Sequence, residues 1–455
     1  MNPNILFLVI DSFRADKFIG INKTSVTPNL DYLIKSGTYF KQAISSSDAT
    51  LVSEASTFTG LFPIKSGVRS HKFNKIRKDV KTYFQIFGDL NYKFYGYFPQ
   101  VAMAIGLLPN FENSDKSYAR HPTLVDGAGK RIIEKLQSGN MNNPWFFYIH
   151  CMDLHFPISI PSEFDNKKFG TTKYDRQISA IDFWIGKIIK CIDLKNTLVV
   201  ITADHGSYNK ELYFDNNEIN FGSNSGIQKY STFLGSRTPK VLIPLRTKIF
   251  VILEKIRKKR KIKKIEKLNL SPHEKRNLLN QRGDTDRFVY DDLFRIPLLL
   301  VGPGIQEGKI ISQQVRSIDI CPTISHILGL PNRDDEIDGR SLIPFISGEK
   351  TDDLIAFMES EPLLDLKSNN VIGIRTPDFK YFRDRFNPNK LVHLYDLRDD
   401  PNENNNLARF NLEKVSELEK ILQDITKNYV FTRDNSINVK EAEKIESELR
   451  KLGYI

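Results

Sequence analysis

The chain contains 455 residues, of which 40% are hydrophobic and 27% charged, a composition that can bury one large core and a smaller one. Its net charge is +11, and its 3 cysteines are widely separated, which excludes a disulfide framework and a structural zinc cluster. No segment approaches the roughly 18 consecutive apolar residues of a membrane-spanning helix, and the N-terminus lacks a signal-peptide pattern, so we expect a cytoplasmic protein.

Short apolar runs alternate with helical patterns along most of the chain. This alternation is typical of βαβ units around a mainly parallel sheet, so we predict an α/β fold. The expected core strands are residues 5–10, 145–150, 197–202 and 297–301. The expected helices are residues 29–36, 51–59, 80–90, 127–138, 173–192 and 318–328.

The pattern changes after Gly339. Shorter strand-like segments are expected at residues 354–358, 371–375 and 381–383, and a helix at residues 412–427. We therefore predict a large α/β domain at residues 1–345 and a small C-terminal α+β subdomain with a tail helix at residues 346–455.

Positive charge is concentrated at residues 255–264, which read KIRKKRKIKK and follow a mainly apolar stretch at residues 241–254. Three interpretations stay open: a solvated helical excursion, a basic amphipathic helix lying on an anionic membrane surface, or a docking site for an anionic polymer or partner. Membrane contact through residues 241–264 would make the protein peripheral to the membrane. Nucleic-acid binding is not favoured, because no known binding motif accompanies the charge.

Three polar residues follow predicted strands: Asp11 comes after the first, and Asp204 and His205 come after residues 197–202. Ligands of open α/β sheets gather at the carboxyl ends of strands, so these side chains can meet there around a metal. The alternatives are a helix cap at Asp11 and a hydrogen-bonded loop pair at the other two. Calcium or magnesium would suit carboxylates alone, but His205 favours zinc or manganese at a single divalent site.

Several segments together resemble the sulfatase family of the alkaline phosphatase superfamily. They are NILFLVIDSFRAD (4–16), TPNLDYLIKSGTYFKQA (27–43), ATLVSEASTFTGLFP (49–63), YIHCMDLHFP (148–157), ITADHG (201–206), FRIPLLLVGPG (294–304), DICPTISHILGLP (319–331), DGRSLIP (338–344) and LYDLRDDPNENNNLA (394–408). The resemblance covers nearly the whole chain. It implies a three-layer sandwich around a large mostly parallel sheet, a smaller C-terminal subdomain, and hydrolysis of sulfate or phosphate esters.

The resemblance places the nucleophile at Thr50, beside the metal and at the start of the helix expected at residues 51–59. Backbone amides and the helix dipole favour an anion there, and attack by the Thr50 hydroxyl would give a covalent intermediate that water later cleaves. The alternative role of Thr50 is an N-cap. Family members convert a Cys or Ser to formylglycine, a conversion not obvious for Thr, and Ser12 and Glu54 replace the usual Asp and Arg. These departures favour a phosphorus ester.

Further site residues are implied by the same resemblance. His155 matches a residue that contacts the anionic ester or protonates the leaving group, a task suited to an imidazole near neutral pH. His150 is expected either to bind substrate or to be a core histidine at a strand end, and Arg287 is the expected anion contact. Asp153 is a weaker candidate for a second metal, and Arg14 is expected to anchor the fold through an ion pair.

Three functional classes follow from these residues. The leading one is a metal-dependent hydrolase that cleaves phosphate or sulfate esters through Thr50. The second is a transferase that moves a phospho-substituted head group between lipid and glycan, and the third is a binding protein that keeps the fold without catalysis. In the first two classes the partner is an anionic ester, which could be linked to lipid or glycan. Residues 207–281 emerge next to the metal pair and are expected to form a lid that selects substrate.

Overall fold

The computed structural model describes residues 2–69, 75–118, 123–156, 158–208, 211–214, 217–220, 259–260, 262–279, 288–349, 351–360 and 370–427. Contacts divide the chain into two compact units, Met1–Ser207 with Gly283–Ile455, and Tyr208–Arg282. Among the described residues, none of the helices combines the length and the apolar character needed to cross a membrane.

The first unit is built on an eight-stranded sheet with the strand order β10-β2-β9-β6-β1-β5-β3-β4. Neighbouring strands are parallel except around β9, which is antiparallel to both β2 and β6. The two reversals cancel, so β2 runs in the same direction as β6, β1 and β5. The strands are β1 (Asn4–Ile10), β2 (Gly37–Ile44), β3 (Lys93–Pro99), β4 (Ser117–Tyr118), β5 (Trp145–Cys151), β6 (Thr197–Thr202), β9 (Arg295–Val301) and β10 (Lys309–Arg316).

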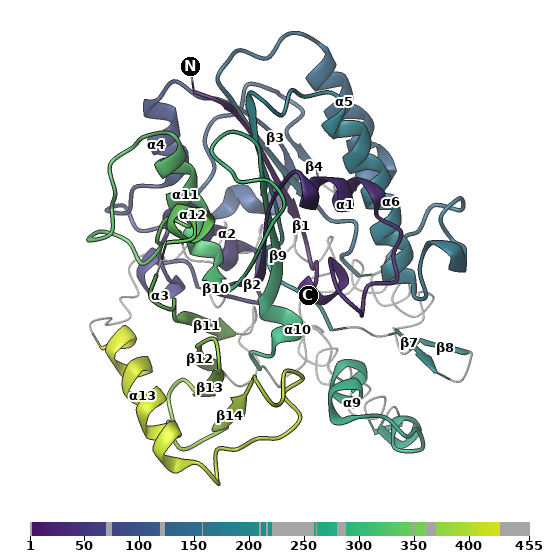
Figure 1. The fold of residues 1–455 in the computed structure, drawn as a ribbon, viewed down its shortest axis with the longest axis vertical. Helices are drawn as coiled ribbons and strands as arrows, with labels where there is room; N and C mark the ends of the chain where they lie inside the picture. The colour runs from purple at the N-terminus through teal and green to yellow at the C-terminus, as the bar shows by residue number, and fades with distance from the viewer. Residues whose placement is uncertain are drawn as a thin grey trace, which may run out of the picture. The chain divides into compact units, whose positions relative to one another are not determined.

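Helices cover both faces of this sheet, which gives the three layers visible in Figure 1. One face carries α1 (Pro28–Lys35), α5 (Gly129–Gln137) and α6 (Lys173–Ile189). The opposite face carries α2 (Thr50–Thr59), α4 (Tyr83–Asp89), α11 (Ile320–Ile327) and α12 (Ile343–Ser347). Shorter helices are α3 (Pro63–Ser66) and α10 (Asp291–Phe294). Because both faces are covered, the central strands read as continuous apolar runs and are buried along their length.

Aromatic side chains fix α2 against the sheet. The ring of Phe58 lies 4.4 Å from that of Phe84 on α4 and 4.9 Å from that of Phe7 on β1, measured between centroids. Phe58 also meets Tyr148 on β5 edge to face. Rings packed in these geometries contribute beyond their buried area. The C-terminal half of α2 is therefore held rigidly, and this sets the position of its first residue, Thr50.

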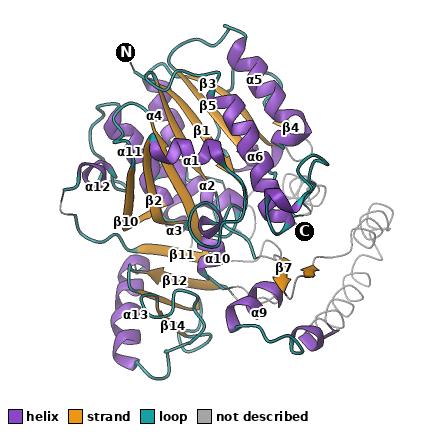
Figure 2. Cartoon of the chain, turned by 45° about the vertical axis from the view of Figure 1, so that its right-hand side comes forward, coloured by secondary structure: helices purple, strands orange, loops and turns teal. Residues whose placement is uncertain are grey.

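A second sheet follows in the C-terminal part, with the antiparallel order β11-β12-β13-β14, and α13 (Leu412–Thr426) packs on it (Figure 2). Leu418 and Leu422 of that helix are buried in its core. Glu359 of this sheet bridges to Ser47 in the loop that precedes α2, and its amide donates to the carbonyl of Ser46 at 3.0 Å. The strands are β11 (Ala356–Ser360), β12 (Val371–Arg375), β13 (Phe379–Asp384) and β14 (His393–Asp396).

The predicted fold class is confirmed: a large, mostly parallel mixed sheet between helical layers, with a smaller C-terminal α+β part. The predicted core strands and helices all recur within a few residues, whereas β2, β3, β10 and β14 were not foreseen. The domain boundary expected at residue 345 falls inside α12, between the last strand of the first sheet and the first strand of the second, and stays a prediction.

The second unit contains a hairpin of β7 (Glu211–Phe214) and β8 (Asn217–Asn220), and the helix α9 (Pro272–Leu279). A small apolar cluster of Ile265, Leu270 and Leu278 packs within it. Residues 221–258 and 261 lie outside the described residues, so the structure does not test the amphipathic helix expected at residues 241–264.

Candidate active site

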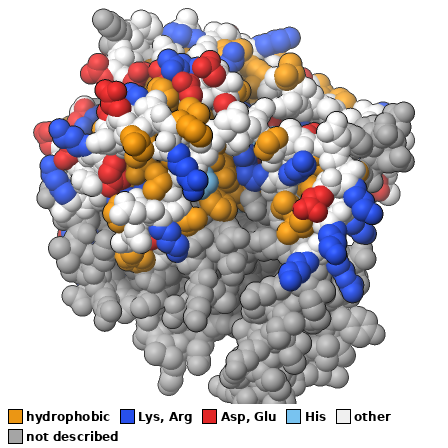
Figure 3. Space-filling model, turned by 90° about the horizontal axis from the view of Figure 1, so that it is seen from below, with side chains coloured by type: hydrophobic (Ala, Val, Ile, Leu, Met, Phe, Trp, Pro, Cys, Tyr) orange, Lys and Arg blue, Asp and Glu red, His pale blue; other side chains and the backbone are white. Residues whose placement is uncertain are grey.

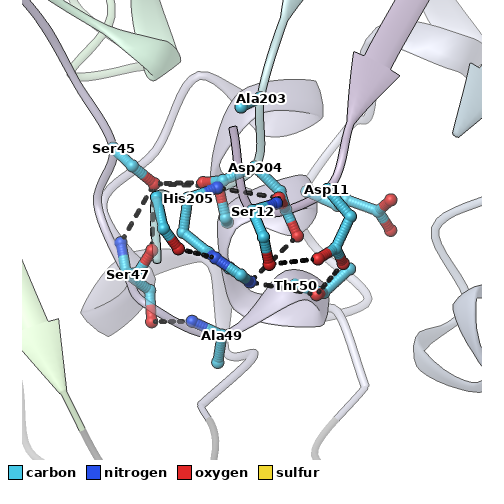
Figure 4. Close-up of polar contacts among 12 residues, drawn as sticks. Asp11, Ser12, Ser45, Ser47, Ala49, Thr50, Ala203, Asp204 and His205 are labelled. Atoms are coloured by element: carbon cyan, nitrogen blue, oxygen red, sulfur yellow. Dashed lines mark hydrogen bonds and ion pairs between the residues drawn. The ribbon is translucent and has the colours of Figure 1, made fainter. Parts of the chain in front are cut away.

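The candidate site lies at one edge of the large sheet, where β1, β2, β5 and β6 all end. Because these strands run in the same direction, their carboxyl ends share that edge, which is where open α/β sheets bind ligands. Asp11 directly follows β1, and Asp204 and His205 follow β6 by two and three positions. The loop after β2 leads to Thr50. Figure 4 shows the four side chains converging.

Asp11, Asp204 and His205 form a ligand cluster, with ligand atoms within 4.8 Å of one another, and all three are buried. His205 Nδ1 lies 2.7 Å from the carbonyl oxygen of Gly206. A carbonyl can only accept, so Nδ1 carries the proton and Nε2 presents its lone pair. Nε2 lies 3.2 Å from Asp204 Oδ2, which is also an acceptor. Acceptors that face each other in a buried site are what a cation requires, so these residues fit a divalent metal.

The Thr50 hydroxyl lies beside this cluster. Its Oγ1 is 3.3 Å from Asp11 Oδ2 and 3.4 Å from His205 Nε2, and the residue is buried. Thr50 is the first residue of α2, while Ala49 occupies the N-cap position and no side chain caps the helix. The alternative of Thr50 as an N-cap is therefore wrong. The hydroxyl instead points at the ligands of the proposed metal site.

Hydroxyl groups hold the loop after β6 in place. Ser45 and Ser53 both donate to the backbone carbonyl oxygen of Asp204 at 2.6 Å, and their two oxygens are 3.0 Å apart. Ser12 has φ +65°, and its Oγ donates to Asp11 Oδ1 at 2.5 Å. The amide of Ser12 donates to Asp204 Oδ1 at 3.2 Å. Ser12 thus orients both carboxylates of the cluster instead of supplying a carboxylate of its own.

Arg14 ties this loop region together. Its guanidinium forms ion pairs with Asp16 and Asp292, each at 2.8 Å, and donates to the carbonyl of Ser207 at 3.1 Å. The expected anchoring role of Arg14 is confirmed by these contacts. Position 206 requires a glycine, because a Cβ there would lie 2.2 Å from the carbonyl oxygen of Asp292.

A buried network lies behind Asp11. Glu54 Oε1 accepts from the hydroxyl of Tyr148 and lies 2.5 Å from His150 Nδ1, while His150 Nε2 is 3.6 Å from Asp11 Oδ2. Burial opposes the imidazolium, but the carboxylates of Glu54, Asp11 and Asp204 outweigh it and raise the pKa of His150 to about 10. The fully buried His150 therefore faces two protein carboxylates, and its predicted contact with substrate stays a prediction.

The remaining predicted residues are placed as follows. His155 is buried in the turn after β5, where its amide donates to the carbonyl of Met152 at 3.0 Å, and its catalytic role stays a prediction. Arg287 lies outside the described residues. Asp153 belongs to no metal-ligand cluster among the described residues. Its carboxylate accepts from the amides of Leu124 at 2.8 Å and Val125 at 3.3 Å, so it fastens a backbone turn.

Sequence reasoning missed the parts of the site that support the ligands. The roles of Ser45, Ser53 and the pair of Glu54 with His150 were not foreseen. One signal was present: Ser53 and Glu54 follow Thr50 by three and four positions, and residues at that spacing lie on the same side of a helix. Side chains next to Thr50 on one face of α2 were therefore candidates from spacing alone.

Comparisons with known proteins agree with this fold. The family model described as Sulfatase matches residues 3–330. A second model, described as the C-terminal part of N-sulphoglucosamine sulphohydrolase, matches residues 283–429. Arylsulfatase K of Bos taurus is 33% identical over 127 residues, which are 26% of this chain and 23% of that protein. The stretches matching the first curated relatives span about a quarter of the relatives' own length.

Two solved structures share the fold over nearly the whole chain. The phosphonate monoester hydrolase of Agrobacterium radiobacter has a TM-score of 0.64 and 17% identity, covering 94% of this chain and 96% of that one. BT4656, in complex with its substrate D-glucosamine-2-N,6-O-disulfate, has a TM-score of 0.62 and 16% identity, covering 96% and 99%. At these identities the likeness concerns the fold.

Proposed function

Because this chain belongs to the sulfatase family, we propose that it is a sulfuric ester hydrolase that uses Thr50 as its nucleophile and acts with a divalent metal. The observation that carries the proposal is the position of the Thr50 hydroxyl, 3.3 Å from Asp11 and 3.4 Å from His205. Asp11, Asp204 and His205 would hold the cation, which would neutralise charge on the ester oxygens and lower the pKa of the hydroxyl.

The proposed reaction has two displacements at the sulfur of the ester. In the first, Thr50 Oγ1 gives its proton to water and forms a bond to sulfur as the bond from sulfur to the alcohol oxygen breaks, and a proton passes to the departing alcohol. His155 is the proposed donor of that proton. In the second, water attacks the same sulfur, gives one proton to His155 and the other to Thr50 Oγ1, and releases Thr50 with sulfate. Thr50 has a single oxygen on Cβ, and in the intermediate this oxygen is bonded to sulfur. The bond that water breaks therefore has to be the one between Oγ1 and sulfur.

A phosphorus ester is the second candidate substrate, because the same Thr50 hydroxyl can form and release a phosphoryl ester by the same two displacements. The fold and the ligand cluster serve both substrates. A transferase that passes the group to a lipid or glycan alcohol is less favoured, since the similar curated proteins include an arylsulfatase and a choline-sulfatase. The convergence of Thr50 with three ligand residues argues against a catalytically inactive binding protein.

The experiment that tests the proposal compares wild type with Thr50→Ala and Thr50→Ser on an aryl sulfate, an aryl phosphate monoester and an aryl phosphate diester. We expect Thr50→Ala to lower kcat/KM on the preferred ester on the order of 1,000-fold, and Thr50→Ser to retain a measurable part of it. Mass spectrometry of the quenched wild-type reaction should find the ester on the peptide containing Thr50. Wild-type turnover that survives in Thr50→Ala would exclude Thr50 as the nucleophile.

A further inference from the structure

A chain of buried contacts leads from α2 through β5 to the ligand that follows β1. We propose that Glu54 is a positioning residue, which fixes Asp11 in the metal site by holding the imidazole of His150 against it. This inference rests on the proposed metal site and adds to it a residue that contacts neither metal nor substrate. Glu54, His150 and Asp11 are 2%, 0% and 0% exposed, so water does not compete for these contacts.

The geometry of His150 is set by Glu54. A carboxylate oxygen can only accept, so the contact of 2.5 Å between Glu54 Oε1 and His150 Nδ1 places a proton on that nitrogen and fixes the plane of the ring. The ring then directs its other nitrogen, Nε2, at Asp11 Oδ2, 3.6 Å away. Asp11 Oδ2 is the same atom that the Thr50 hydroxyl contacts at 3.3 Å. A displacement of the imidazole would release the carboxylate oxygen nearest the nucleophile.

The backbone makes this coupling stiff. Thr50 and Glu54 are four positions apart on α2, so one helix carries both the nucleophile and the anchor of His150. Tyr148 and His150 are two positions apart on β5 and lie on the same face of the sheet, and the Tyr148 hydroxyl donates to the same oxygen of Glu54. On the neighbouring strand, Ile10 pairs with Cys151, which brings Asp11 next to this end of β5.

Stability alone is a poor reason for this arrangement. Two buried ionisable groups lose their hydration, and their attraction commonly fails to exceed that cost. Glu54 Oε2 has no hydrogen-bond partner among the described residues, which adds to the cost. A well-packed apolar side chain on this face of α2 would stabilise the core as much as the pair of Glu54 and His150 does. Outer groups that orient metal ligands do change metal binding, typically by about 10- to 100-fold.

The test measures binding of Mn²⁺ and Zn²⁺ to the metal-free full-length chain by titration calorimetry, together with kcat and KM on the preferred aryl ester. We expect Glu54→Gln to weaken metal binding by about 10- to 100-fold. We also expect it to lower kcat more than KM changes, because Asp11 rather than the substrate pocket is disturbed. Tyr148→Phe keeps the pair of Glu54 and His150, and it should shift both quantities in the same direction by a smaller factor.

Glu403→Gln is the matched control, because Glu403 is also a buried glutamate, 2% exposed, and its Oε1 lies 2.8 Å from the Lys380 ammonium in the C-terminal part. It should lose thermal stability and keep wild-type metal affinity. Equal metal affinity in wild type and folded Glu54→Gln, or equal losses in Glu54→Gln and Glu403→Gln, would overturn the positioning role. Wild type that binds neither cation would overturn the metal site itself, a result that differs from a failure confined to Glu54.

Discussion

The two adjacent residues that follow β6, Asp204 and His205, make different contacts. Asp204 uses its side chain as a metal-ligand candidate and its backbone carbonyl as the acceptor for two serine hydroxyls. His205 uses Nδ1 to bond the carbonyl of Gly206, and this leaves Nε2 for the cation. Each of these side chains is therefore held in one orientation by a hydrogen bond with a neighbouring residue.

Asp204→Asn is expected to lose metal. The amide of Asn offers a weaker, neutral ligand. Its NH₂ group could also donate a hydrogen bond to His205 Nε2 and so occupy the lone pair that a cation would use. Metal content of the purified variant, measured by atomic emission, should fall well below one ion per chain. Asp182→Asn provides the comparison: Asp182 is also a buried aspartate, but it accepts from the amide of Leu30 at 2.7 Å in α1. Undiminished metal in Asp204→Asn would refute the ligand assignment.

Elements bring these side chains together through strand direction. Reversal at β9 allows β2 to run parallel to β6, and so the loop from β2 to α2 opens at the same edge as the loop after β6. The second sheet contributes at the same place, because Glu359 at its β11 strand pairs with Ser47 in that loop. The Arg69 guanidinium reinforces the contact with an ion pair of 2.6 Å to Glu359. The loop between β2 and α2 is thus held between two sheets.

The attachment of α13 to the second sheet should depend on pH. Burial raises the pKa of Glu419, but hydrogen bonds from Arg383, Gln423 and Tyr381 outweigh it and hold that pKa below its usual value. A carboxyl group with a lowered pKa in the folded state stabilises the protein above its ordinary pKa, and this stabilisation is lost as the pH falls through the lowered value. Glu419→Gln should therefore lower Tm at about pH 7, and the effect should shrink progressively as the pH falls below the ordinary pKa of a glutamate and through the lowered value.

Thermal denaturation of wild type and Glu419→Gln across this pH range measures the difference. Glu417→Gln on the same helix is the matched control, since the Glu417 side chain is 53% exposed in its pair with Lys414, and exposed pairs contribute little. A gap in Tm between wild type and Glu419→Gln that stays constant with pH would contradict the assigned contacts.

The whole molecule consists of two compact units, and the smaller one, Tyr208–Arg282, begins three residues after His205. On the face drawn in Figure 3, Lys and Arg side chains of the described residues lie among Asp, Glu and apolar groups. We propose that the smaller unit serves substrate selection, because it continues directly from the metal-ligand loop.

Deletion of residues 240–281 tests that role. We expect the shortened chain to change its preference among large anionic esters more than its kcat/KM on a small aryl ester, because a lid or wall acts on the parts of the substrate far from the reacting bond. Steady-state kinetics on a sulfated oligosaccharide and on an aryl sulfate measure the two effects. Equal losses on both substrates would assign a folding role to the segment, and circular dichroism of the deletion variant would show it.

The sequence alone predicted the α/β class, the central strands and the candidate ligands Asp11, Asp204 and His205, because apolar runs that end in polar residues are local patterns. The candidate Thr50 came from the family resemblance of its segment. Only the tertiary structure decided what surrounds them. The strand β2 has two polar residues, Lys41 and Gln42, near its centre, and it pairs with β9 and β10, which lie more than 250 positions away in the chain. Its place in the sheet therefore depends on long-range pairing.

Glu54 illustrates the same division. Its sequence position places it on the helix of Thr50, but the contacts with Tyr148 and His150 come from a strand more than 90 positions later. Hydrogen bonds between such distant residues leave no periodic trace in the chain. The packing of α2 against β5 creates them, and that packing results from burying aromatic side chains whose partners the sequence does not specify.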